Sequence, residues 1–219
     1  MKFINIHTHS SSDNADVLEI VNQYPTSFED TNAFFSIGIH PWHINPENWK
    51  EELAIIEEKI QLENCLALGE CGLDKRRETP MELQIEIFEA QLLLAQKYQM
   101  PVVIHCVAAF QELIVLKQKL NTTVPLVIHG FSKSEELALQ LLKNGFYISF
   151  GKYLLRNPEL QMVFELVPDD RFFLETDTIE EGIEEVYALA AKYKNRDVVS
   201  LQQIVNKNFN TVFKNGRVD

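Results

Sequence analysis

Two histidines separated by one residue stand near the start of the chain. His7 and His9 follow a short apolar run that reads as a β-strand. On a strand, residues i and i+2 point to the same face, so both imidazoles can reach one cation. The alternative is that both are ordinary polar residues at a strand end. The pair alone therefore makes a metal site a hypothesis and nothing more.

Two further histidines occupy equivalent positions in similar segments. His105 lies in PVVIHC and His129 in PLVIHG, each after a β-branched apolar run. A lone histidine at such a position is more typical of a core residue whose hydrogen bonds are satisfied. Two histidines at matched positions, together with the first pair, favour metal ligation.

Two carboxylates also follow apolar runs. Glu70 ends CLALGE, and burying an unpaired carboxylate is costly, so we expect a partner for it. A metal is the expected partner, and a salt bridge to Arg76 or Arg77 is the alternative. Asp177 ends RFFLETD and is expected to join the metal ligands, although it could also cap a following helix.

These residues form one set with mixed nitrogen and oxygen donors. The set is too large for one tetrahedral zinc and suits two cations that share a carboxylate. Its donors are compatible with zinc, manganese, magnesium or nickel and do not choose among them. Two such cations can activate a water for a phosphoryl or acyl displacement. The predicted ligands are His7, His9, Glu70, His105, His129 and Asp177.

The elements that must position these ligands alternate between short apolar runs and longer stretches with helical spacing. Strands are expected at 3–9, 33–41, 65–74, 101–106, 125–131, 146–151 and 171–177. Helices are expected within 46–64, 80–99, 110–120, 133–144 and 180–193. The pattern predicts an α/β fold with parallel strands. A distorted TIM-like (β/α) barrel is favoured over an open sheet, because a barrel brings the carboxyl ends of all strands to one rim.

The beginning of the chain departs from this plan. The strand candidate Val17–Gln23 follows His9 after only seven residues, SSSDNAD. A parallel crossover usually needs about a dozen residues or more. We therefore expect Val17–Gln23 to pair as an antiparallel hairpin or edge strand. The barrel should then be abbreviated in its first βα units, without a full helix between residues 10 and 32.

Composition limits the classes of protein. The length of 219 residues predicts a single domain, 1–219. The net charge of −12 argues against a broad nucleic-acid surface but allows a small phosphate site around cations. Three cysteines make a disulfide scaffold implausible. No membrane span, signal peptide or protein partner is indicated, so a cytoplasmic protein is expected.

Several motifs together resemble one family. HTH, GIHPW, GECGLD, PVVIHC, IHGFS, ETD and NFNTVF stand in the order and roughly the spacing of the TatD family of metal-dependent hydrolases, in the amidohydrolase superfamily. The resemblance spans nearly the whole chain. It implies a distorted TIM barrel and metal-dependent deoxyribonuclease activity, including 3′–5′ exonuclease trimming of DNA.

The resemblance also implies roles for the ligands. His7, His9 and Asp177 would hold one metal and His105 and His129 the other, with Glu70 bridging them. In this scheme Asp177 and Glu70 are the catalytic carboxylates, and Asp177 accepts the proton of the attacking water.

Substrate residues are less clearly indicated. The resemblance places His40, in GIHPWH, near the substrate, and Arg77 matches an arginine of the family. For His43 packing is favoured over function. Val107 stands where the family commonly has an arginine, and Thr178 where a proline is usual. These departures leave hydrolysis better supported than a DNA substrate.

Two alternative functions remain open from the sequence. The same metals could hydrolyse an amide, ester or aminoacyl substrate. The chain could also be a non-catalytic metal-binding protein on the same scaffold, because a fold does not guarantee a function.

Overall fold

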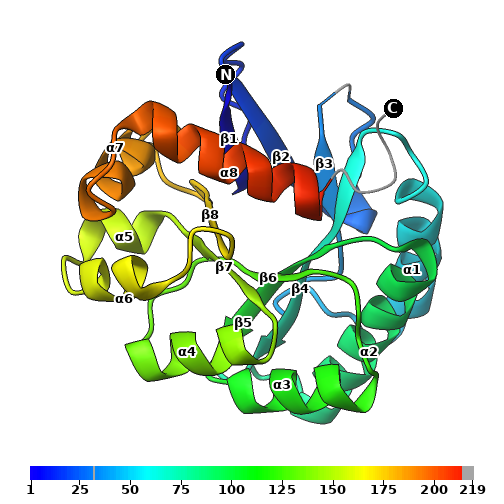
Figure 1. Ribbon diagram of the computed structural model, residues 1–219. Helices are drawn as coiled ribbons and strands as arrows, with labels where there is room; N and C mark the ends of the chain where they lie inside the picture. The colour runs from blue at the N-terminus through cyan, green and yellow to red at the C-terminus, as the bar shows by residue number, and fades with distance from the viewer. Residues whose placement is uncertain (32, 214–219) are drawn as a thin grey trace. The chain divides into compact units, whose positions relative to one another are not determined.

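The computed structural model describes residues 1–31 and 33–213, which form two compact units (Figure 1). Unit 1 comprises Met1–Val21 and the described part of Val127–Asp219, and unit 2 comprises Asn22–Leu126. The single domain expected from the chain length stays a prediction.

Unit 2 is built on three parallel strands. The long strand β4 (Cys65–Asp74) is buried along its whole length and pairs with β3 (Phe35–Ile37) and β5 (Val102–Val107). Helix α2 packs on β4, and α3 packs on β5. The helices of this unit are η1 (Pro25–Ser27), α1 (Trp49–Lys59), α2 (Met81–Tyr98) and α3 (Phe110–Lys119).

Glycines let β4 approach β5 closely where the site residues emerge. The pairing of the two strands shifts register between Leu68 and Cys71. Gly69 and Gly72 have φ of +134° and +146°, a backbone region that favours glycine. A Cβ at Gly72 would overlap the carbonyl oxygen of His105. The irregular stretch of β4 that carries Glu70 therefore depends on the lack of a side chain at these glycines.

Unit 1 also consists of parallel strands with helices between them. Strand β7 (Tyr147–Phe150) pairs with β6 (Leu126–Ile128) and with β8 (Phe172–Leu174). An isolated bridge between Thr8 and Asp177 joins β1 (Phe3–Thr8) to the segment that follows β8. The helices are α4 (Glu135–Lys143), α5 (Lys152–Arg156), α6 (Leu160–Leu166), α7 (Ile183–Tyr193) and α8 (Val198–Val212). Helix α8 contacts both β1 and β8 (Figure 1).

The predicted antiparallel pairing of residues 17–23 is wrong. Strand β2 (Val17–Gln23) pairs parallel with β1, with Phe3 opposite Val17. The physical reason is the length that the connection can cover. A parallel pairing requires it to run back along β1, whose six residues span about 20 Å, and the eight residues between Thr8 and Val17 can extend over about 26 Å. The connection is held by Glu19, which accepts hydrogen bonds from the backbone N–H and hydroxyl of Ser12 at 2.9 and 2.6 Å. A loop thus replaces the usual crossover helix.

The expected shortening of the first βα units is present. Among the described residues between 10 and 31, the only helix is the short η1. Elsewhere strands and helices alternate in chain order, as predicted for an α/β fold of the TIM-barrel type. Among residues 1–31 and 33–213, no helix is both long and apolar enough to cross a membrane.

Candidate metal centre

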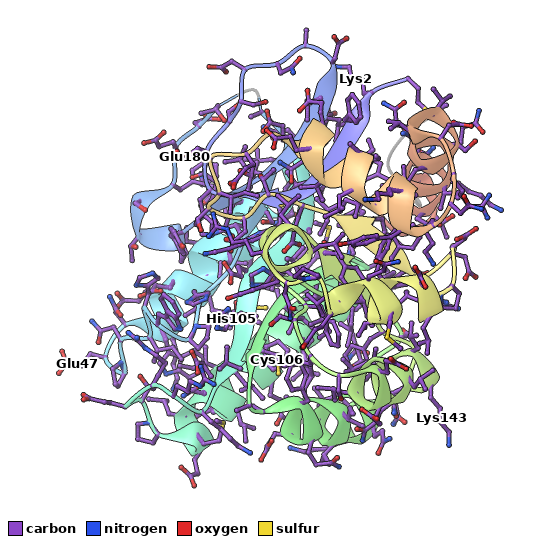
Figure 2. All side chains as sticks on the ribbon, turned by 90° about the vertical axis from the view of Figure 1, so that its left-hand side faces the viewer. Lys2, Glu47, His105, Cys106, Lys143 and Glu180 are labelled. Atoms are coloured by element: carbon purple, nitrogen blue, oxygen red, sulfur yellow. The ribbon has the colours of Figure 1, made fainter. Side chains whose placement is uncertain are left out.

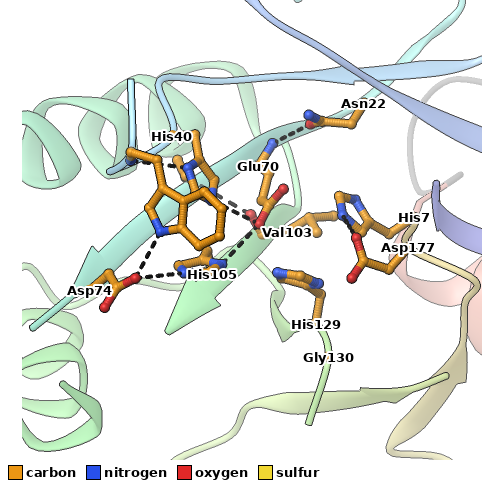
Figure 3. A network of polar contacts seen from close by, with 12 residues as sticks. His7, Asn22, His40, Glu70, Asp74, Val103, His105, His129, Gly130 and Asp177 are labelled. Carbon is orange, nitrogen blue, oxygen red and sulfur yellow. Dashed lines mark hydrogen bonds and ion pairs between the residues drawn. The ribbon is translucent and has the colours of Figure 1, made fainter. Parts of the chain in front are cut away.

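Glu70 is the centre of the polar group in unit 2 (Figure 3). Its side chain is almost fully buried, and its backbone N–H donates to Oδ1 of Asn22 at 2.7 Å. Its Oε1 lies 3.1 Å from Nε2 of His40 and 3.0 Å from Nδ1 of His105. One donor atom from each of Glu70, His40 and His105 lies within 4.8 Å of the others. This spacing fits a divalent cation that accepts both nitrogen and oxygen donors.

The hydrogen bonds of His40 determine which ring nitrogen carries its hydrogen. The backbone N–H of Trp42 donates to Nδ1 of His40 at 3.0 Å, so Nδ1 is an acceptor. In the neutral ring the hydrogen is then on Nε2, which donates it to Glu70. His40 therefore holds the carboxylate of Glu70 in place.

Asp74, the last residue of β4, is a site residue that the sequence reasoning did not single out. Its Oδ2 accepts a hydrogen bond from the indole N–H of Trp42 at 2.7 Å and lies 3.5 Å from Nε2 of His105. Burial alone would raise the pKa of Asp74. The hydrogen bonds from Trp42 and from the backbone N–H of Arg76 outweigh burial and hold this pKa below its usual value. Asp74 is thus an ionised partner for His105.

A recognisable signal for Asp74 was present in the sequence. It is an acidic residue at the end of a buried apolar strand, which is the criterion that selected Glu70. The cationic side chain of Arg77 lies over the ring of Trp42, with Cζ 4.8 Å from the ring centre. Arg77 is exposed, and its contact with Trp42 places it beside the Asp74–His105 pair.

In unit 1 the donors gather around Asp177. Its Oδ1 lies 3.8 Å from Nε2 of His7 and 3.5 Å from Nε2 of His9. The rings of His7 and His129 are 4.5 Å apart, and one donor atom each of His7, His129 and Asp177 lies within 4.8 Å of the others (Figure 3). This second group also offers two nitrogens and a carboxylate oxygen to a cation.

Backbone hydrogen bonds fix Asp177 against β1. Its N–H donates to the carbonyl of His7 at 3.0 Å, and the N–H of His9 donates to the carbonyl of Asp177 at 3.1 Å. Its φ is +58°, in the left-handed region that aspartate tolerates better than most residues. The alternative role as a helix cap is wrong, because α7 begins at Ile183 with Gly182 as its N-cap.

Glu175, the residue that follows β8, supports His129. Its Oε1 lies 3.5 Å from Nδ1 of His129 and accepts a hydrogen bond from the N–H of Gly130 at 2.6 Å. Burial alone would raise the pKa of Glu175, but the contact with His129 outweighs it, and the pKa lies below the usual value. Carboxylates of this kind orient the histidine ligands of metals.

The cysteines next to the ligands are packing residues. Cys106 follows His105 on β5 and is buried, whereas His105 is only partly buried. Figure 2 labels both residues, and Glu47 of the same unit lies at the surface. Burial raises the pKa of the Cys106 thiol to about 12. The thiol is therefore protonated at neutral pH and is a poor metal ligand.

The structure brings the predicted residues together within each unit. Unit 2 groups Glu70, His105, His40 and Arg77, and unit 1 groups His7, His9, His129 and Asp177. Sequence reasoning missed Asp74 and Asn22. The link of Asn22 to the site is its hydrogen bond with the backbone of Glu70, which only the folded chain reveals.

Comparison with known proteins identifies the family of these motifs. The model of the TatD related DNase family matches residues 1–214. The chain belongs to the TatD family. An uncharacterized metal-dependent hydrolase of Bacillus subtilis is 33% identical to this TatD family member over 148 residues, 66% of the chain and 58% of that protein. A 3′-5′ ssDNA/RNA exonuclease TatD of Erwinia tasmaniensis is 31% identical over 166 residues, 73% of the chain and 61% of that protein.

The chain matches only part of the length of these relatives in sequence, but its fold matches whole solved structures. The alignment spans about three fifths of the length of these TatD relatives. A TatD homologue of Escherichia coli of known structure has a TM-score of 0.81 at 22% identity, over 97% of this chain and 98% of that one. A TatD family hydrolase of Entamoeba histolytica has the same TM-score at 19% identity, over 97% of this chain and 98% of that one. The predicted TIM-like fold is thus confirmed.

Proposed function

We propose that this TatD family member is a metal-dependent hydrolase that cleaves phosphodiester bonds, in the manner of a 3′–5′ exonuclease on single-stranded DNA or RNA. The observation that carries the proposal is the pair of donor groups, one in each unit, each with three donor atoms within 4.8 Å. Two relatives, a metal-dependent hydrolase and a 3′-5′ ssDNA/RNA exonuclease, support the reaction class by their own names.

We further propose that two divalent cations are bound per chain. The ligands would be His7, His9, His129 and Asp177 of unit 1 and Glu70 and His105 of unit 2. Imidazole and carboxylate donors suit zinc, manganese, nickel and magnesium to different degrees. Bound divalent cations supply polarisation of a phosphoryl oxygen and a lowered pKa of water.

The two carboxylates have distinct roles in this proposal. Asp177 lies three residues beyond β8, with its Oδ1 near His7 and His9, and it accepts the proton of the attacking water. Glu70 is held by His40, by His105 and through its backbone by Asn22, so its carboxylate is oriented before substrate arrives. Such preorganisation lowers the cost of reaching the transition state.

His40 and Arg77 are the proposed substrate residues. Arg77 is exposed and stacked on Trp42, and a guanidinium can bind phosphate through two parallel hydrogen bonds. His40 contacts substrate from the position in which it holds Glu70. A cytoplasmic location is also proposed, since all three cysteines are buried and none forms a disulfide.

The proposal is tested with metal-reconstituted protein and 3′-labelled single-stranded DNA. Metal content is measured first, and trimming is then followed with added Mn²⁺, Mg²⁺ or Zn²⁺. Glu70→Gln is the control, because it keeps the size of the side chain and removes its charge. Hydrolysis of amide, ester or aminoacyl substrates instead of DNA would overturn the phosphodiesterase assignment. Metal binding without any hydrolysis would indicate a non-catalytic protein.

A further inference from the structure

A cavity of about 250 Å³ opens in unit 2 beside His40. It lies between η1, the residues that follow β3 and the first turn of α1, and its walls include Tyr24, Thr26, His43 and Glu52. Ligand pockets typically measure about 300–1,000 Å³, so this cavity has room for one small planar group. None of the proposed metal ligands lines it.

Glu52 is the unusual residue in this cavity. It is 5% exposed on α1, and among residues 1–31 and 33–213 its carboxyl group has no hydrogen-bond or ion-pair partner. Burial raises the pKa of this carboxyl group. A buried carboxylate without a partner is costly, and a ligand that donates a hydrogen bond would remove that cost.

Aromatic rings form the other walls. The rings of Tyr24 and His43 meet edge to face, with centres 5.1 Å apart, and the rings of His43 and His40 are 5.6 Å apart. Flat aromatic side chains of this kind are the usual platforms on which unstacked nucleobases lie. The carboxyl group of Glu52 is thus accompanied by surfaces suited to a planar ring.

His40 connects the cavity to the proposed reaction centre. It lines the cavity and also donates to Glu70 through Nε2 at 3.1 Å. A group bound in the cavity would therefore be separated from Glu70, a proposed metal ligand, by the side chain of His40.

We propose that this cavity is a base-binding subsite, in which Glu52 accepts a hydrogen bond from the exocyclic amino group of a nucleobase stacked against Tyr24 or His43. Acceptance from cytosine N4 by a glutamate is an established base contact. Cytosine, adenine and guanine each carry an exocyclic amino group, whereas thymine carries none. The identity of the substrate as a nucleic acid rests on the proposed function. The existence of the subsite rests on the geometry of unit 2 alone.

The test compares binding of deoxycytidine and thymidine monophosphates to the full-length protein by calorimetry. The wild type should bind deoxycytidine monophosphate at least about fivefold more tightly than thymidine monophosphate. This factor corresponds to the lower end of the free energy typical of one specific base contact. Glu52→Met removes the hydrogen-bonding group at similar size and should abolish this preference. Glu52→Gln keeps an acceptor oxygen and should retain part of it. Glu51→Gln, an exposed neighbour on the same helix, is the matched control and should bind like the wild type.

Trimming of oligonucleotides ending in cytosine or thymine distinguishes this inference from the proposed function. Loss of the cytosine preference in Glu52→Met, with an unfolding temperature at least equal to that of the wild type, supports the subsite. Binding that depends on Glu52 in a protein that cleaves no DNA would support the subsite and contradict the nuclease assignment. DNA cleavage with equal binding of both nucleotides by the wild type would overturn the subsite alone.

Discussion

His40 donates a hydrogen bond to Glu70 because its other ring nitrogen already accepts one from the backbone of Trp42. The two contacts measure 3.1 and 3.0 Å and together specify one neutral form of the ring. A histidine in this arrangement orients a carboxylate ligand as the outer partners of metal sites do. His40 is therefore connected both to the proposed metal ligands and to the cavity lined by Glu52.

Replacing His40 by phenylalanine should weaken metal binding. The variant keeps a flat ring but loses the hydrogen bond to Glu70, and loss of an outer partner typically lowers metal affinity about 10- to 100-fold. Metal titration followed by calorimetry measures the change. His43→Phe is the control, because His43 is exposed and contacts His40 from the cavity side. Equal metal affinity in both variants would show that His40 does not position Glu70.

Asp177→Asn should bind metal poorly and lose at least about 100-fold in hydrolytic rate, the scale for removing a general base. Asparagine tolerates the left-handed φ of +58° at this position, so the fold should persist. Circular dichroism and metal analysis accompany the rate measurement. Full activity in the folded variant would contradict the role assigned to Asp177.

Gly72→Ala should destabilise the protein strongly. Its Cβ would overlap the carbonyl oxygen of His105, and φ of +146° is unfavourable for alanine. Backbone strain alone costs about 1–3 kcal/mol, and the overlap adds to it. Gly182→Ala is the matched control, because the added Cβ meets only the flexible end of Glu184. Urea unfolding of both variants gives the comparison, and similar stabilities would argue against the close approach of β4 to β5.

Lys194→Met should lower stability by about 1–3 kcal/mol, chiefly the cost of leaving the carbonyl of the buried Val167 without its hydrogen-bond donor. Its ammonium donates to the carbonyls of Val167 and Glu165 at 2.5 and 3.1 Å. The same group lies 5.2 Å from the ring centre of Phe164. Lys192→Met, at an exposed position of α7, should change the free energy of unfolding little. Thermal unfolding of the two variants decides whether this lysine holds α7 in unit 1.

The sequence by itself predicted the candidate metal ligands. Residues i and i+2 of a strand share a face, which predicted that His7 and His9 would act together. Both lie near Oδ1 of Asp177 in the structure. The repeated V-I-H pattern likewise selected His105 and His129, and the order of motifs identified the family. These features depend on local periodicity, which can be read along the chain.

Tertiary structure decided what depends on distant neighbours. The parallel pairing of β2 follows from the reach of a loop that could also have closed a hairpin. The grouping of His7 with His129, and the contact of Asp74 with His105, join residues far apart in sequence. The direction in which a ring or carboxylate points is set by packing and by hydrogen bonds from other segments. Local sequence does not contain those distances, so only the folded chain specifies them.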